Sequence, residues 1–357
     1  MLKYLICLLW GHGTFTRVEK VIHPPISFKN VKGELEACRK DGDGHYHNFS
    51  HLPSLWSCQG YYSMSDAPTA RPFLKWVGGK TQLLPELRKF YPPRGSFTQY
   101  HEPFLGGGAV FFDLVAQGIL DPTMNHVFLS DANKELATTY QTLRNSVELV
   151  ISMLRNHTIQ HRIDPQRHFY HVRSMCPEIV MVVAARMIYL NKTCFNGLYR
   201  VNRQGTFNVP LGRYKNPNIC DEENLRACSA VLTRTTVDCA DFRDLRQTVS
   251  ERDFVYLDPP YVPISATANF ASYTNAGFDH IDQESLVDVA HELDSRGAFL
   301  LLSNADTPET RKLYKGFNIH SVEARRNVNS AGDKRGKVGE IIVCNDHLKN
   351  LLKGISQ

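Results

Sequence analysis

The chain has 357 residues, of which 42% are hydrophobic and 22% charged, and its net charge is +5. This composition is ordinary for a globular protein, and it excludes the collagen-like and low-complexity classes. The mild positive charge permits a nucleic-acid partner without requiring one, because the distribution of the charge matters more than its sum.

The nine cysteines form no Cys-x-x-Cys pair. An odd count in a long chain favours reduced thiols in the cytoplasm over a disulfide framework. Four of the thiols lie in or beside apolar runs and are expected to be buried, namely Cys176, Cys194, Cys239 and Cys344. The apolar segment 5–10 is far too short to span a bilayer and is a poor signal peptide, so no membrane association is expected.

Residues 1–63 mix glycine, histidine, proline and charge with little periodicity, whereas the chain is well patterned from Met64 onward. Two interpretations stand. The segment is either an additional module or an extension upstream of a natural start at Met64. We favour the second, with residues 1–63 disordered or not native to the protein.

Several potential metal ligands lie close together in this N-terminal segment: Cys38, His45, His47, His51 and Cys58. Their spacing matches no zinc module that can be relied on. Scattered histidines in a flexible segment are therefore the favoured interpretation, and no metal site is predicted.

From residue 98 onward, short apolar runs alternate with amphipathic stretches. The runs predict strands at 98–102, 127–131, 235–239, 254–258, 298–303, 318–322 and 340–344. The amphipathic stretches predict helices at 80–90, 107–118, 132–145, 283–296 and 308–315. Such alternation predicts an α/β fold with a parallel sheet and helices on both of its faces.

The alternation breaks between residues 134 and 220, where helices at 147–155 and 177–190 precede a loop region rich in glycine, asparagine and arginine. We therefore expect a discontinuous catalytic domain, formed by residues 64–133 and 221–357. A mainly helical domain, residues 134–220, is inserted into it.

The first motif in chain order is Lys75-Trp76-Val77-Gly78-Gly79-Lys80, just before a predicted helix. Lys75 and Lys80 can meet a carboxylate, and Trp76 can cover an apolar or cationic group such as a sulfonium. The alternative is a core tryptophan flanked by two solvent-exposed lysines. The adjoining glycines favour the binding interpretation.

A second motif, Glu102-Pro103-Phe104-Leu105-Gly106-Gly107-Gly108, follows a predicted strand and opens a helix. Glycines at such a turn let a ligand approach the backbone, although tight packing alone also requires them. Two further strands end near acids, Asp131 and then Asp241 beside Phe242. Acids at successive strand ends suit a ribose diol and an adenine, and together they predict a nucleoside cofactor.

A buried strand, 254–257, runs directly into Asp258-Pro259-Pro260-Tyr261. The carboxyl end of such a strand is where open α/β sheets bind ligands. The Asp258 carboxylate and the Pro259 carbonyl can accept both hydrogens of an exocyclic amine, which localises the nitrogen lone pair. The Tyr261 ring can stack on a base taken out of the helix. This tetrapeptide therefore predicts methylation of an exocyclic base nitrogen, with no need of a metal.

Residues 71–344 resemble the Dam-type, D12 class DNA adenine-N6 methyltransferases, whose members methylate adenine within GATC. The resemblance rests on the three motifs above, on Leu129-Ser130-Asp131-Ala132-Asn133, and on the loop 265–270 behind the catalytic tetrapeptide. It implies a Rossmann-like sheet, S-adenosylmethionine as cofactor and base flipping. The residues implied to bind the cofactor are Trp76, Lys80, Glu102, Phe104, Gly106, Asp131, Asp241, Phe242 and Asp258.

The inserted region contains no acidic residue between Lys192 and Lys215, as expected of a surface that meets DNA. The resemblance implies that this region holds a β-hairpin that reads the sequence. Its implied DNA contacts are Asn196, Leu198, Arg200, Pro210, Arg213 and Tyr214. A basic loop that touches only phosphates is the alternative. A second basic cluster suits backbone contact, and it comprises Arg325, Arg326, Lys334, Arg335 and Lys337.

An RNA methyltransferase or a protein-glutamine methyltransferase with the same fold is the alternative within enzymes. Related enzymes acting on protein glutamine typically carry Asn at the first motif position and those acting on cytosine-N4 carry Ser, so Asp258 favours adenine. A catalytically silent DNA-binding regulator is disfavoured by the intact motif set. The expected protein is a monomeric, cytoplasmic, nucleoid-associated enzyme acting on double-stranded DNA.

Overall fold

The computed structural model describes residues 28–31, 34–40, 46–48, 69–202, 204–261, 278–324 and 338–354. The chain divides into two compact units, Met1–Ala67 and Pro68–Gln357. Within the first unit, β1 (Phe28–Val31), β2 (Glu34–Lys40) and β3 (Tyr46–Asn48) form an antiparallel sheet in that order. Of the clustered cysteines and histidines, only the backbones of Cys38 and His47 lie among the described residues.

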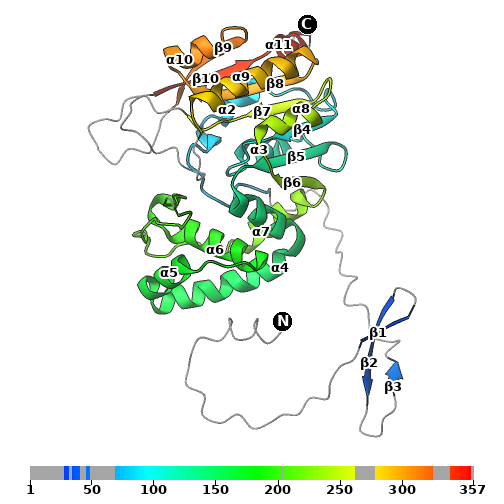
Figure 1. The fold of residues 1–357 in the computed structure, drawn as a ribbon, viewed down its shortest axis with the longest axis vertical. Coiled ribbons are helices and arrows are strands. Elements are labelled where there is room, and N and C mark those ends of the chain that lie inside the picture. The colour runs from blue at the N-terminus through cyan, green and yellow to red at the C-terminus, as the bar shows by residue number, and fades with distance from the viewer. Residues whose placement is uncertain are drawn as a thin grey trace. The chain divides into compact units, whose positions relative to one another are not determined.

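The second unit is built on a seven-stranded sheet with the order β6-β5-β4-β7-β8-β10-β9 (Figure 1). Its strands are β4 (Gln99–Glu102), β5 (His126–Asp131), β6 (Thr235–Cys239), β7 (Phe254–Leu257), β8 (Phe299–Ala305), β9 (Asn318–Ala324) and β10 (Val338–Cys344). All seven predicted strands are therefore present, and the predicted α/β fold with a Rossmann-like sheet is confirmed.

The sheet is mixed rather than wholly parallel, which corrects the expectation from the sequence. The strands from β6 to β8 run parallel, but β10 pairs antiparallel with both β8 and β9. The β9–β10 ladder begins at Ala324 and Val338, the residues that flank the 325–337 connection. Two strands joined directly at one end form a hairpin and must run antiparallel. Apolar patterning predicts a strand but carries no information about its direction.

The helices of the second unit are α2 (Leu84–Leu87), α3 (Ala109–Ala116), α4 (Lys134–Ile163), α5 (Pro165–Ser174), α6 (Val180–Thr193), α7 (Glu222–Leu232), α8 (Leu245–Thr248), α9 (His280–Ser295), α10 (Pro308–Leu313) and α11 (Asp346–Lys353). Short 3-10 turns add η1 (Lys80–Gln82), η2 (Arg88–Phe90), η3 (Phe195–Gly197) and η4 (Phe242–Asp244). Among the described residues, no helix is long and apolar enough to cross a membrane.

Three predicted helices differ in detail from the structure. The stretch 80–90 forms η1, α2 and η2 instead of one helix, and Pro85 in the first turn of α2 supplies no backbone N–H to a preceding turn. The predicted helices 132–145 and 147–155 form one element, α4, which bends at Ser146 where the backbone is not helical (φ −152°, ψ 43°).

Side-chain caps fix where several helices begin. Asn133 accepts from the backbone N–H of Leu136 at the start of α4, and Asp164 caps α5 in the same way. Asp279 and Asp282 form a reciprocal capping box at the start of α9. The first of these caps matters most for the site, because Asn133 lies two residues after the strand end at Asp131.

Buried residues pack on both faces of the sheet. Along β7, Phe254 and Tyr256 join one hydrophobic cluster, whereas Val255 and Leu257 join another. Successive strand residues point to opposite faces, so a strand covered on both sides reads as a continuous apolar run. The second cluster includes α9, and the first is formed with α3, α4 and α7. The predicted two-sided coverage is thus confirmed.

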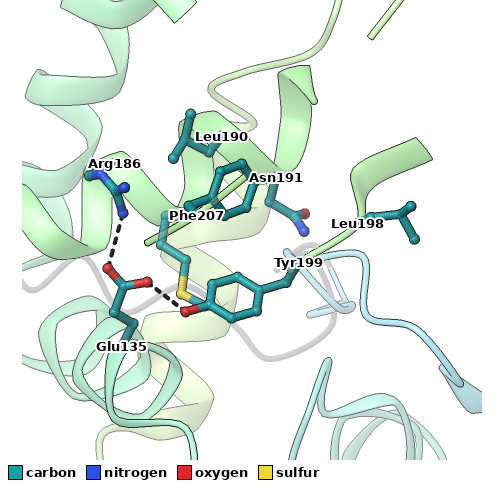
Figure 2. Close-up of a pocket in the computed structure, with 8 residues that line it drawn as sticks. Glu135, Arg186, Leu190, Asn191, Leu198, Tyr199 and Phe207 are labelled. Carbon is teal, nitrogen blue, oxygen red and sulfur yellow. Dashed lines mark hydrogen bonds and ion pairs between the residues drawn. The ribbon is translucent and has the colours of Figure 1, made fainter. Parts of the chain in front are cut away.

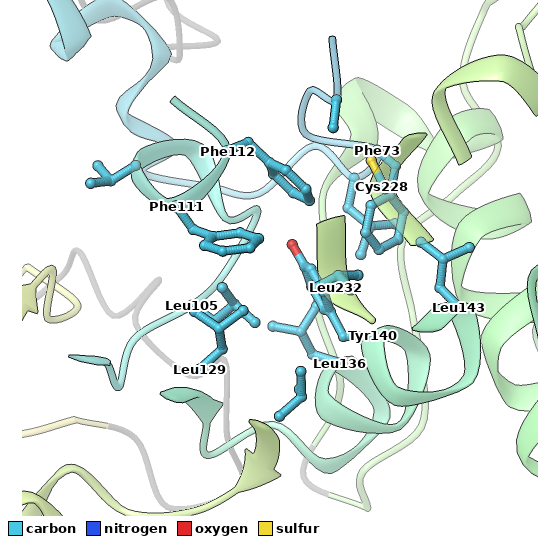
Figure 3. Packing of buried hydrophobic residues seen from close by; sticks show 14 of the residues in the cluster. Phe73, Leu105, Phe111, Phe112, Leu129, Leu136, Tyr140, Leu143, Cys228 and Leu232 are labelled. Atoms are coloured by element: carbon cyan, nitrogen blue, oxygen red, sulfur yellow. The ribbon is translucent and has the colours of Figure 1, made fainter. Parts of the chain in front are cut away.

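The first cluster includes Leu105 of the glycine-rich turn and Tyr140 of α4 (Figure 3). The buried Tyr140 of α4 packs edge-on against Phe73, with ring centroids 4.8 Å apart, and its hydroxyl donates to the Gly106 carbonyl at 3.2 Å. A core aromatic residue of α4 therefore helps to fix the position of the glycine-rich turn at the edge of the sheet.

The inserted helices form a separate group next to the sheet (Figure 1). α4 contacts β5 and β6 and also packs along α6, so one helix belongs to both the sheet and the inserted region. The cysteine predictions are half right. Cys194 and Cys344 are buried, whereas Cys176 is exposed in the loop after α5 and Cys239 is exposed at the end of the edge strand β6.

We predict that a chain starting at Met64 folds as stably as the full chain, because Pro68–Gln357 forms a compact unit of its own. Calorimetry should give a Tm within about 2 °C of the full-length value, roughly the shift that a 1 kcal/mol loss would produce in a unit of this size. An insoluble truncated chain, or a much lower Tm, would make residues 1–63 a structural domain and would call for a zinc assay of its cysteines and histidines.

Candidate active site

The acidic residues predicted from strand ends meet at one edge of the sheet. β4, β5 and β7 run parallel and end at Glu102, Asp131 and Leu257, and Asp258 follows directly. Carboxyl ends of parallel strands form the ligand-binding edge of open α/β sheets. The predicted catalytic and cofactor residues on these strands are therefore brought together.

Asp258 is held through one of its two carboxylate oxygens. The β7–β8 register pairs Leu257 with Leu302, which places Asp258 beside Ser303. The Ser303 hydroxyl donates to Asp258 Oδ1 at 3.0 Å, and Lys80 Nζ lies 2.7 Å from the same oxygen. Among the described residues, both of these contacts use Oδ1, so Oδ2 remains available to a ligand.

Lys80 is the partner of the catalytic motif in this structure. Its side chain is 5% exposed, and its ammonium also donates to the Gly78 carbonyl at 2.6 Å and lies 4.8 Å from the centre of the Tyr261 ring. Burial by itself lowers the pKa of Lys80, but the charges of Asp258, Tyr261 and Glu340 outweigh it and raise the pKa above its usual range. Lys80 therefore stays charged.

Burial also affects the pKa of Asp258, the carboxyl partner of Lys80. It raises the pKa of Asp258, and the Lys80 charge and the Ser303 hydrogen bond oppose that rise. With an ammonium 2.7 Å away, the ionised carboxylate is the form that accepts hydrogen bonds.

Hydrogen bonds to β10 and α9 hold the rest of the tetrapeptide in place. The Tyr261 hydroxyl donates to Glu340 Oε2 of β10 at 3.2 Å. Gln283 of α9, 1% exposed, donates to the Pro260 carbonyl at 3.1 Å. Sequence reasoning did not identify Gln283, Glu340 or Ser303. The sequence did offer one signal for Ser303, because it is a polar residue inside an otherwise apolar strand.

Asp131 organises the glycine-rich turn. Its Oδ2 accepts from the Gly106 N–H at 3.0 Å and its Oδ1 from the Asn133 N–H at 2.8 Å. Burial raises the pKa of Asp131 to about 6. Gly106 has φ +49°, and a Cβ there would lie 2.8 Å from Trp76 Cδ1, so only glycine fits between the turn and the indole.

Glu102 is a buried carboxyl group, 2% exposed, that accepts from the Tyr100 hydroxyl at 2.8 Å. Burial raises its pKa to about 8, although the Tyr100 hydrogen bond opposes the shift. A group with such a pKa is mostly protonated near neutral pH, and a cation arriving beside it would favour the ionised form.

The end of β6 carries an aromatic cluster. Phe104 stacks on Phe242 with ring centroids 5.6 Å apart, and Phe278 meets Phe104 edge-on at 5.8 Å. Asp241 is exposed, caps η4 through the Arg243 N–H at 2.9 Å, and pairs with the Arg243 guanidinium. Phe104 and Phe242, both expected to bind the cofactor, are therefore adjacent, while the Asp241 carboxylate already has a cationic partner.

The predicted DNA-contacting residues lie on the two arms of one loop after α6. The arms are joined by Phe195 N–H to Pro210 carbonyl and Asn208 N–H to Arg200 carbonyl bonds of 2.9 and 3.0 Å. An antiparallel bridge from Val201 to Phe207 makes the loop a short hairpin, as the sequence predicted.

The surface of this hairpin carries most of the predicted contacts. Leu198 is half-buried, and five others are exposed, namely Asn196, Arg200, Pro210, Arg213 and Tyr214. The Arg200 Nε donates to Asn208 Oδ1 at 2.7 Å. The ammonium of Lys75, from the first motif, lies 5.4 Å above the Tyr214 ring, so the first motif reaches the hairpin.

Some predicted features fall outside the described residues. These are the 265–270 loop, Arg203, and the basic cluster of Arg325, Arg326, Lys334, Arg335 and Lys337. In the parts of the chain that the structure does describe, no group of three or more metal-ligating side chains is arranged to hold an ion.

Comparison with known proteins places this geometry in a family. The model of the D12 class N6 adenine-specific DNA methyltransferases matches residues 76–328, which contain the motifs described above except for Lys75. One solved structure, the rRNA methyltransferase aviRa from Streptomyces viridochromogenes, is a remote likeness with a TM-score of 0.34 and 14% identity over 80% of this chain and 90% of that one.

Curated relatives match over most of their own length. The chain is 41% identical over 291 residues to the type II methyltransferase M.MjaIII of Methanocaldococcus jannaschii, covering 77% of this chain and 99% of the relative. It is 40% identical to M1.LlaDCHI of Lactococcus lactis subsp. cremoris, covering 77% and 95%. It is 33% identical to a DNA adenine methylase of Vibrio cholerae, covering 76% and 95%. The chain therefore belongs to the D12 class of N6 adenine-specific DNA methyltransferases.

Proposed function

We propose that this enzyme transfers the methyl group of S-adenosylmethionine to N6 of an adenine flipped out of double-stranded DNA, within the sequence GATC, and that it acts as a monomer in the cytoplasm. The observation that carries the chemistry is the orientation of Asp258, whose Oδ1 is held by Lys80 and Ser303 while Oδ2 is left for the substrate. The DNA sequence is argued from the hairpin.

The target amine would be held by two acceptors. Asp258 Oδ2 and the Pro259 carbonyl each accept one amino hydrogen, which turns the nitrogen lone pair towards the donor. Proline at 259 supplies no N–H that would compete, and Gln283 holds the neighbouring Pro260 carbonyl at 3.1 Å. Tyr261, braced by Glu340, would stack on the flipped base. Positioning of this kind supplies much of the rate.

The cofactor would lie along the same edge. The Gly106 turn and Trp76 allow close approach to the backbone, Glu102 faces the cationic part, and Asp131 and the Phe104–Phe242 pair serve the nucleoside. When bound, S-adenosylmethionine supplies an electrophilic methyl group on a sulfonium. The protein residues orient it and exclude water.

Replacing Asp258 tests the chemistry. Asp258→Ala should abolish methyl transfer while cofactor affinity stays within about tenfold, because this carboxylate orients the amine. The variant also leaves Lys80 buried without its partner, which costs about 3–5 kcal/mol of stability. The double variant Asp258→Ala, Lys80→Met should therefore recover stability without recovering activity. A folded alanine variant with full activity would rule out this mechanism.

The protonation of Glu102 gives a pH test. A cationic ligand beside Glu102 lowers its pKa from about 8, so binding releases a proton and affinity should rise as pH increases towards 8, then level off. In Glu102→Gln that part of the pH dependence should disappear. Calorimetric titration with S-adenosylmethionine in buffers of different ionisation enthalpy measures the proton release. Equal pH profiles for both proteins would place the cofactor's cationic group elsewhere.

Arg200 and Lys215 separate base reading from phosphate contact. Arg200 projects from a hairpin without acidic residues and can bridge guanine O6 and N7, so Arg200→Ala should cost about 1–3 kcal/mol on GATC and relax discrimination at one base pair. Lys215→Ala should weaken all sequences alike and flatten the salt dependence. Methylation rates on oligonucleotides with each base of GATC changed singly, at two salt concentrations, measure both. Equal losses on all sites for Arg200→Ala would make it a phosphate contact.

A further inference from the structure

Tyr199 lies between two of the proposed DNA contacts, Leu198 and Arg200, yet its own side chain points inward. It is 9% exposed and lies over a small pocket between α4, α6 and the hairpin, together with Glu135 and Phe207 (Figure 2). Tyr199 is thus a buried aromatic residue within the proposed DNA-binding hairpin. The position of the hairpin is therefore linked to the residues that contact the Tyr199 side chain.

Two partners lie beneath Tyr199, one in the proposed cofactor site and the other close to it at the start of α4. Its ring stacks on Trp76 with centroids 5.2 Å apart and planes 24° apart, and Trp76 is the residue that closes over Gly106. Its hydroxyl donates to Glu135 Oε2 at 2.8 Å (Figure 2). Glu135 lies in the first turn of α4, four residues after Asp131, which binds the Gly106 N–H.

Glu135 is itself fixed, so it can transmit a displacement. The buried Arg186 of α6 lies 3.0 Å from Glu135 Oε1. The same guanidinium donates to the carbonyls of Val172 and Arg173 at 3.1 and 3.0 Å. With both carboxylate oxygens occupied, Glu135 offers Tyr199 one well-defined acceptor, and a shift of the hairpin would break or strain that bond.

A second side chain joins the same two segments independently. Asn191, 4% exposed, accepts from the Lys75 N–H at 2.8 Å and donates to the Lys75 carbonyl at 2.7 Å. Its amide also donates to the Gly197 carbonyl at 3.0 Å. Lys75 precedes Trp76, and Gly197 precedes Leu198, so one buried amide ties the cofactor loop to the hairpin backbone.

We propose that Tyr199 and Asn191 are positioning residues that couple the methyl-donor site to the base-reading hairpin, so that S-adenosylmethionine and cognate DNA each strengthen binding of the other. The proposal rests on the proposed function, because it takes the Trp76–Gly106 edge as the donor site and residues 196–200 as the reading arm. Neither residue touches a reacting atom. Their effect is to hold Trp76 in its binding position only when the hairpin is correctly placed.

The test measures the dissociation constant of S-adenosylmethionine on the full chain, alone and with a GATC duplex or one with a single changed base. The ratio without and with DNA is the coupling factor. For the natural chain we expect about 5- to 150-fold with GATC, and a smaller factor with the altered duplex. Tyr199→Leu should bring the GATC factor to within about twofold of unity, and Tyr199→Phe, which keeps the ring, should lower it less.

Tyr189→Phe is the matched control. Tyr189 is a buried tyrosine of the neighbouring helix α6 whose hydroxyl meets His161 at 2.9 Å, away from the cofactor loop, so its loss should leave the coupling factor unchanged. Tm is measured for every variant, and Tyr199→Phe, the conservative change, decides the matter if Tyr199→Leu does not fold.

The outcomes separate the two claims. A natural chain without coupling, or a folded Tyr199 variant that keeps the full factor, overturns the inference. A lower factor in the Tyr199 variants with an unchanged factor in Tyr189→Phe supports it. The proposed function fails on a different observation, namely that the natural chain binds no S-adenosylmethionine or methylates no adenine in GATC.

Discussion

The candidate active site depends on one largely buried ion pair, between Lys80 and Asp258. Removing two charges from water is costly, and their attraction compensates only when further hydrogen bonds satisfy both groups. Here Ser303 supports the carboxylate, and the Gly78 carbonyl and the Tyr261 ring support the ammonium. The pair therefore fixes the loop before η1 against the end of β7, and the catalytic carboxylate gains a single orientation.

Burial also affects the protonation of the other carboxyl groups at this edge of the sheet. Among the residues that the structure describes, neither Glu102 nor Asp131 pairs with a lysine, and burial raises their pKa values to about 8 and about 6. An edge of the sheet that keeps one carboxylate ionised and another largely neutral is electrostatically suited to a ligand that brings its own positive charge. Family membership supplies such a ligand class, a methyl donor.

Local sequence patterns were sufficient to predict the strands and the acidic residues at their ends. β7 and β8 read as apolar runs because both of their faces are covered, and Asp258 follows a run directly. Such patterns could not predict the residues that support the tetrapeptide and the hairpin. Ser303 and Glu340 contact the tetrapeptide across 45 and 79 positions of sequence, and only the sheet register brings them there. The same holds for Asn191, whose partner Lys75 lies 116 positions away.

The insertion of β10 between β8 and β9 has a consequence for the order in which the enzyme assembles. Glu340, which braces Tyr261, belongs to β10, so the support of the catalytic tetrapeptide arrives late in the chain. During synthesis the ribosome releases the glycine-rich turn and the hairpin well before this strand. A nascent chain can therefore form the parallel strands first, and the active site becomes complete only when the last strand enters the sheet.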